Sequence, residues 1–231
     1  MSTDPTLQQA TGDIGGFILA NYRDKSGQLH AANAVNALGA LAGIFAQVQA
    51  RSMLQSGAIP QGGDALIEVT SKAGEKFYFG DAINRCVLEG TRETPSFWNV
   101  AAGAGGDPKI GDKVDVLEIA KRTARDVGVP AFGTPQIDAR YKLSEHPVGV
   151  VQKHGPVLLR RFLEINLHPT QLTLAFGAVA QTLAAFAAGE ISDVPVNVPM
   201  KRVDIVRLYM EAAIPASKLD IAAVGMVVDS R

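Results

Sequence analysis

The spacing of hydrophobic residues predicts a chain that is mostly helical. In QLHAANAVNALGALAGIFAQVQARSMLQSG, residues 28–57, apolar residues recur at steps of three and four, and Gly57 can end the helix. The same pattern, with fitting caps, predicts further helices over 12–23, 81–90, 114–128, 172–188 and 201–213. Between them, 65–79 carries two β-prone runs, LIEVT and KFYF, around SKAGE, which has the length and the glycine of a hairpin loop. We therefore expect a mainly helical α+β protein with a multi-helix core and one β-hairpin.

Two of these helices bear on self-association. The 28–57 helix has a second face of small residues, namely Ala32, Asn36, Gly39, Gly43, Ala46 and Ala50, which lets another helix approach closely. The 172–188 helix has almost no polar face. The apolar and small-residue faces of these two helices need more protein surface packed against them than short amphipathic helices supply. We therefore expect a homodimer with at least one of the two helices near the interface. The alternative is that both helices lie inside one monomeric core.

Length and composition set the class of protein. The 231 residues are 47% hydrophobic and 19% charged, which is ordinary for a soluble globular chain. We expect one domain over 1–231, with a candidate internal boundary in the Gly/Pro-rich stretch 91–112. The formal charge of −1 gives no basic excess, so we expect no nucleic-acid partner.

The compartment is expected to be the cytoplasm. One cysteine cannot form an intrachain disulfide, and the polar start MSTDPTLQQATGD lacks the pattern of a signal peptide. The apolar stretch 172–188 is shorter than the roughly 20 residues that span a bilayer. We expect a buried helix there and no membrane partner.

Three of the four histidines, His146, His154 and His168, lie within residues 144–170, each close to a proline. Pro147 is well placed to begin a helix with His146 as its N-cap, Gly155-Pro156 should break that helix, and Pro169 should open another. The histidines would then lie at helix joints, too far apart to share one zinc ion. We expect no metal and no cofactor, with ordinary terminal histidines as the main interpretation and one histidine in a pocket as the alternative.

Other motifs offer little chemistry. Cys86 shares a helical face with Ile83 and Val87, which favours burial over nucleophilic catalysis. GDPKIGDK, 106–113, differs from a phosphate-binding loop at the essential lysine, and no serine lies in a GxSxG motif. Arg160 and Arg161 share a face with Glu164, which indicates a solvated surface rather than an anion clamp.

The remaining candidate segment is TRETPSFWNVAAGAGGD, with the only tryptophan and no helical period. Arg92, Glu93, Trp98 and Asn99 supply charge, a stacking surface and hydrogen-bonding groups, and the glycines permit movement beside a pocket. The alternative is that Phe97 and Trp98 pin the loop to the core. With His146 and His154, these four residues form the predicted ligand-binding set.

The function expected from these features is that of a soluble binding or interaction protein, with a small molecule as a candidate ligand. An enzyme whose catalytic groups converge from distant loops is the first alternative, because such groups need not be neighbours in the chain. A purely structural oligomer subunit is the second.

Overall fold

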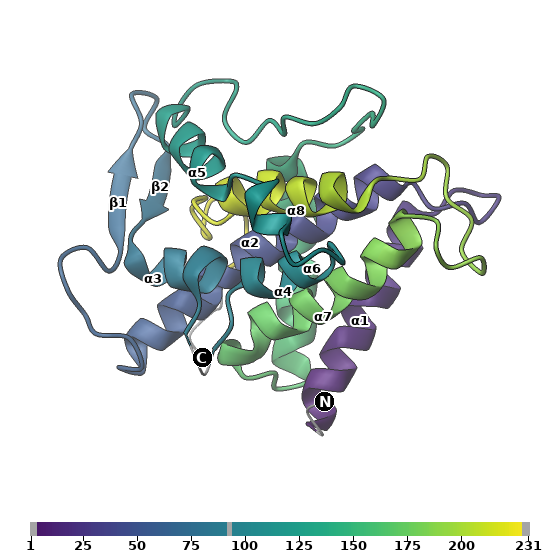
Figure 1. Cartoon of the computed structure of the whole chain (residues 1–231). Helices are drawn as coiled ribbons and strands as arrows, with labels where there is room; N and C mark the ends of the chain where they lie inside the picture. The colour runs from purple at the N-terminus through teal and green to yellow at the C-terminus, as the bar shows by residue number, and fades with distance from the viewer. Residues whose placement is uncertain (1–3, 92–93, 228–231) are drawn as a thin grey trace.

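The computed structural model describes residues 4–91 and 94–227, which form a helical bundle with one antiparallel hairpin (Figure 1). The mainly helical α+β class is confirmed. The longer helices are α1 (Pro5–Tyr22), α2 (Ala31–Gln55), α5 (Val116–Arg125), α6 (Pro147–Glu164), α7 (Leu172–Ala187) and α8 (Arg202–Ala216). The shorter elements are β1 (Ile67–Thr70), β2 (Lys76–Phe79), α3 (Asp81–Asn84), the π-helical turn η1 (Arg85–Glu89), α4 (Phe97–Gly103) and the 3-10 turns η2 (Ile110–Asp112) and η3 (Pro169–Gln171).

Helix α2 is the centre of the bundle and packs against α1, α6, α7 and α8. Its small-residue face meets α8 of the same chain. A Cβ atom added at Gly39 would lie 2.6 Å from the Tyr209 carbonyl oxygen, and one added at Gly43 would lie 2.7 Å from Cα of Ala213. The backbones of α2 and α8 therefore touch, which only glycine permits at these two positions. This contact covers the face from which we expected a homodimer, so the homodimer remains a prediction without that support.

Two buried glutamines fix α2 to its neighbours. The Gln47 side chain donates to the carbonyl oxygens of Ser217 and Leu219 at 3.0 and 2.9 Å. The Gln49 Oε1 accepts from the backbone N–H and the hydroxyl of Thr173 at 3.0 and 3.1 Å. Because buried polar groups are costly unless they are hydrogen-bonded, these contacts hold α2 in register with α7 and with the end of α8.

The hairpin packs against the C-terminal segment. Glu68 pairs with Tyr78 in the centre of its register, and the Tyr78 N–H donates to the Lys218 carbonyl at 2.8 Å. On the inner face the rings of Phe77 and Phe132 meet edge to face at 4.8 Å. The predicted hairpin over 65–79 is thus present, at one end of the bundle (Figure 1).

The expectation that Gly155-Pro156 ends the helix that begins at Pro147 is wrong. The helix runs unbroken from Pro147 to Glu164 with Pro156 inside it. Pro156 removes one backbone hydrogen bond, but Leu158, Leu159 and Phe162 beyond it are buried in the same core as Val150 and Val151 before it. Tertiary packing therefore outweighs the local penalty.

Helix α4 corrects the expectation that 91–112 is irregular throughout. Ser96 and Asn99 form a capping box, in which each side chain accepts the other residue's backbone N–H at 3.1 Å. Phe97 is fully buried beneath this helix. The sequence pattern missed α4 because seven residues show too little periodicity and because asparagine replaces the usual Glu or Gln of the capping box.

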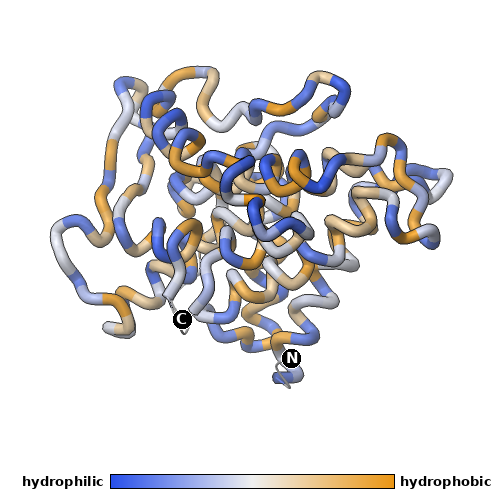
Figure 2. The backbone as a smooth tube through the Cα atoms, in the orientation of Figure 1, coloured by the Kyte–Doolittle hydropathy of each residue, from blue (hydrophilic) through white to orange (hydrophobic). Residues whose placement is uncertain are grey.

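Other boundaries shift by a few residues. Helix α1 begins at Pro5, seven residues before the predicted start at 12, because Asp4 caps it. Helix α5 is capped by Asp115, whose carboxylate accepts the Glu118 N–H at 2.9 Å. Hydrophobic and hydrophilic residues are interspersed along α5, as expected for a helix with one face in water (Figure 2).

Within residues 4–91 and 94–227, two segments are long and apolar enough to cross a membrane by length and composition alone, α2 and the stretch Pro169–Ala187. In α2, 89% of the most apolar 18-residue segment is buried inside the protein, against 56% for the corresponding segment of the second stretch. The core helix of a soluble protein has the same properties, so the expectation of no membrane partner remains a prediction.

Candidate functional site

The predicted ligand-binding residues fall into separate parts of the fold. Arg92 and Glu93 lie outside the described residues. Trp98 is half-buried against the core on α4, and Asn99 is exposed beside it, with its side chain in the capping box. His146 and His154 belong to α6. In the part of the chain that the structure describes, no hydrogen bond or ring contact joins the α4 pair to the α6 pair.

His146 is the N-cap of α6, as predicted. Its Nδ1 accepts the Val148 N–H at 3.3 Å, and its Nε2 lies 3.4 Å from the hydroxyl oxygen of Thr134. Partial burial lowers the pKa of His146, which favours the neutral ring. With Nδ1 as acceptor, the proton of that ring is on Nε2, so the nitrogen facing Thr134 has no lone pair with which to act as a base. The role of His146 that the geometry supports is structural.

His154 lies inside α6 rather than at a helix joint. The ring of Phe17 meets it edge to face at 5.0 Å, that of Tyr22 at 6.2 Å, and its Nε2 is buried without a hydrogen-bond partner. Burial lowers the pKa of His154, with Lys153 adding to the effect. The histidine therefore fills a gap between α1 and α6 as a neutral, largely apolar ring.

Metal and thiol chemistry find little support in the described ranges 4–91 and 94–227. No group of three or more His, Cys, Asp or Glu side chains there could hold a metal ion. Cys86 is buried as predicted, and burial raises the pKa of its thiol to about 12. A thiol with that pKa is almost fully protonated at neutral pH and is a poor nucleophile.

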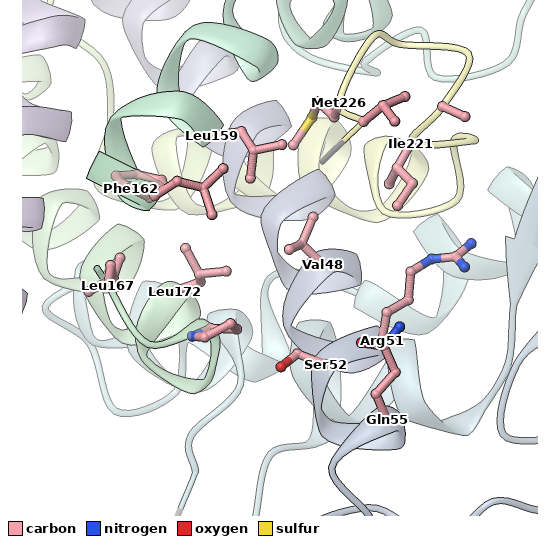
Figure 3. A pocket seen from close by; sticks show the side chains of 14 residues that line it. Val48, Arg51, Ser52, Gln55, Leu159, Phe162, Leu167, Leu172, Ile221 and Met226 are labelled. Carbon is pink, nitrogen blue, oxygen red and sulfur yellow. The ribbon is translucent and has the colours of Figure 1, made fainter. Parts of the chain in front are cut away.

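The structure instead contains an apolar groove beside the C-terminal half of α2, which we call the α2 groove (Figure 3). Its volume is about 470 Å³, within the usual range for small-molecule sites. Three stretches of the chain line it: the end of α2, residues 159–172 from the end of α6 to the start of α7, and the segment after α8. The lining residues are Val48, Arg51, Ser52, Gln55, Leu159, Phe162, Leu163, Leu167, Pro169, Leu172, Ile221, Ala222, Met226 and Val227.

The groove has an apolar side and a polar side. Leu159, Phe162, Leu167 and Leu172 face it from α6, from the following turn and from the start of α7 (Figure 3). Across from them, Arg51, Ser52 and Gln55 follow one another along α2, and the Ser52 hydroxyl points toward the leucines (Figure 3). At the rim, Leu163 and Val227 leave 52% and 61% of their surface in water. A concave apolar wall with a few polar groups at one end is typical of a small-molecule site.

Sequence reasoning missed this groove for a physical reason. Its walls come from residues 48–55, 159–172 and 221–227, which only the tertiary fold brings together. No local motif could have indicated the site.

Lys218 is a second feature that the sequence did not indicate. Only 4% of it is exposed, and its ammonium group donates to Asn84 Oδ1 at 3.1 Å and lies 5.5 Å from the centre of the Phe79 ring. Burial lowers the pKa of Lys218 to about 8. The lysine does not line the α2 groove, so its low pKa bears on stability rather than on binding.

The pH dependence of stability should report this buried lysine. An unfolded lysine stays charged up to a pKa near 10.4, whereas folded Lys218 loses its proton near pH 8. The cost of burying the charge is complete below pH 8 and disappears as the pH rises to about 10.5, so it destabilises the neutral-pH protein by on the order of 3 kcal/mol. Relative to Lys218→Met, the wild-type free energy of unfolding should rise by about that amount between pH 8 and 10.5 in urea titrations. Parallel curves for the two proteins would contradict this.

Comparison with known proteins identifies no similar protein from which the role of the groove could be inferred. No protein-family model, no curated protein sequence and no solved structure matches the chain. The function must therefore be inferred from the groove and the residues around it.

Proposed function

We propose that the protein binds a small, largely apolar molecule in the α2 groove. The observation that carries this proposal is the groove itself, a hollow of about 470 Å³ with a mostly apolar lining drawn from three separate stretches of the chain. Burying apolar ligand surface there would gain roughly 25 cal/mol per Å² before the costs of association. The size and the apolar lining of the hollow favour binding over a purely structural role.

The enzyme alternative has less support than binding. Among the described residues, the lining of the groove contains no histidine, cysteine or carboxylate that could act as an acid, a base or a nucleophile. A second pocket, lined by Thr134, Glu145 and His146 among others, does contain such groups. There, His146 is engaged in capping α6, and Glu145 accepts from the hydroxyl of Tyr22 and from the Lys153 ammonium, both at 2.8 Å. Asp138, the other carboxylate of this pocket, pairs with Arg140 at 3.0 Å, so all three groups are engaged by the fold.

Filling the groove with a side chain should abolish binding. Ser52 is half-buried and points into the groove, so Ser52→Phe places a ring where the ligand would lie without replacing a core residue (Figure 3). Calorimetric titration with 1-decanol and with decanoate below its micelle concentration should show at least a tenfold loss of affinity, about 1.4 kcal/mol. Gln152→Phe, on the exposed face of α6 away from the groove, adds the same ring and should bind as the wild type does.

Two results would count against this proposal in different ways. Equal binding by wild-type protein and Ser52→Phe would place the ligand elsewhere, and no binding of either probe by wild-type protein would overturn the proposal. Thermal unfolding of both variants checks that the added ring has not disturbed the fold.

A further inference from the structure

We infer that the ligand of the α2 groove is an amphiphilic anion, with an anionic head on Arg51 and a hydrocarbon chain along the leucines. This inference rests on the proposed function and names its ligand class. The first step is the charge of the lining. Of the fourteen lining residues, Arg51 alone is charged, and none is acidic. The groove therefore presents one fixed positive charge beside an apolar wall.

The second step is the state of Arg51. Its Nε atom is buried and has no hydrogen-bond partner, and its guanidinium carbon lies 4.2 Å from the centre of the Tyr78 ring. The carboxylate of Glu68 is engaged elsewhere, with the Lys76 ammonium at 2.9 Å and the Tyr78 hydroxyl at 2.8 Å. Arg51 interacts with Glu68 only by longer-range electrostatic attraction, without an ion-pair contact. In the described part of the chain, no carboxylate forms an ion pair with Arg51.

The third step is what this arginine would select. A guanidinium presents its N–H donors in a planar fork that matches the two oxygens of a carboxylate, and stacking on an aromatic ring holds the fork in place. An alcohol would satisfy fewer of these donors, and an ammonium head would be repelled. Gln55, four residues further along α2, offers additional hydrogen-bonding groups to the same head, whereas the Ser52 hydroxyl faces the leucines (Figure 3).

The fourth step is the direction of the chain. Arg51 lies at the flank of α2 nearer Ile221, and Leu167 and Leu172 lie on the other side of the groove (Figure 3). Val48 is placed between them, one helical turn from Arg51 and Ser52. A hydrocarbon tail that starts at Arg51 would therefore cross Val48 and end among the leucines.

The experiment compares three ligands of equal chain length, decanoate, 1-decanol and decylamine, by calorimetric titration of the full chain at neutral pH. We expect wild-type protein to bind decanoate at least tenfold more tightly than either of the others. Arg51→Met should remove that preference, so that decanoate binds no more tightly than 1-decanol does. Arg51→Lys keeps the charge but loses the fork, so it should retain part of the preference. Arg23→Met, which removes an exposed arginine far from the groove lining, should behave as the wild type does.

The outcomes distinguish this inference from the proposed function. Equal binding of decanoate and 1-decanol, or a decanoate preference that survives in Arg51→Met, would overturn the anionic head while leaving groove binding intact. Binding of acetate as tightly as decanoate would overturn the role of the hydrocarbon chain. Absence of binding by all three ligands would overturn both, and so would binding that appears only in a variant ending at Val227, because the chain's own end would then be the occupant.

Discussion

Replacement of Gly43 by alanine is expected to lower the free energy of unfolding by about 3 kcal/mol, the upper end of the usual cost of overpacking a core. The new Cβ would lie 2.7 Å from Cα of Ala213 and closer still to the Ala213 carbonyl group. These are backbone atoms of α8, which cannot move aside as a flexible side chain can. Helices α2 and α8 would have to separate along the most extensive contact of the bundle. Urea unfolding followed by circular dichroism measures the loss.

The same substitution in α1 provides a matched control. A Cβ added at Gly16 meets no atom within 4 Å, and the residue is exposed. Gly16→Ala should therefore stabilise the protein by roughly 0.5–1 kcal/mol, because alanine loses less backbone entropy in a helix than glycine does. Similar effects of the two substitutions would mean that α2 and α8 are not in backbone contact.

The second large effect is expected at the ion pair that joins α5 to α8. Arg122 pairs with Glu211, whose side chain is 4% exposed and which also accepts the Gln136 N–H at 3.1 Å. Burial raises the pKa of Glu211 even with these partners in place. Arg122→Ala would leave this carboxyl group buried without its counter-ion, so we expect a loss of about 3–5 kcal/mol in the free energy of unfolding at pH 7.

A double variant distinguishes the contribution of the ion pair to stability from the cost of leaving the Glu211 carboxylate buried without a partner. Arg122→Leu with Glu211→Leu removes both charges and should recover most of the stability, because an apolar pair of similar volume often replaces a buried ion pair at little cost. Equal losses in the single and double variants would mean that the pair itself, rather than an unpaired carboxylate, accounts for the effect. Chemical denaturation at pH 7 makes the comparison.

Much of the fold could be predicted from the spacing of residue types along the sequence, because the same residues make the packing contacts. The small residues of the 28–57 helix predict a close helix neighbour, and the structure supplies α8, with Gly39 and Gly43 at the points of contact. The β-prone runs of 65–79 predict a hairpin, and Gly74 with φ of 84° makes its turn. In both cases one residue type is required by local geometry, so the sequence carries the information within a few residues.

The features that could not be predicted depend on contacts distant in sequence. Pro156 stays within α6 because a core assembled from other helices covers that face, which no rule for the dipeptide Gly-Pro describes. The α2 groove joins residues 48–55 to segments that begin more than one hundred residues later, and Arg51 gains its importance only from the apolar walls opposite. The predicted pairing of Trp98 and Asn99 with the histidines has no counterpart among the contacts of the described residues.

Methyl spectra of protein carrying ¹³C-methyl methionine test the central claim, that the α2 groove binds an apolar molecule, most directly. Met226 lines the groove, whereas Met200 lies away from it, with its backbone N–H donating to the Ala187 carbonyl oxygen at 2.8 Å. On titration with decanoate, the Met226 methyl signal should shift progressively and saturate, while the Met200 signal stays in place. An unchanged Met226 signal at ligand concentrations that saturate calorimetric binding, or a shift of the Met200 signal alone, would contradict binding in the α2 groove.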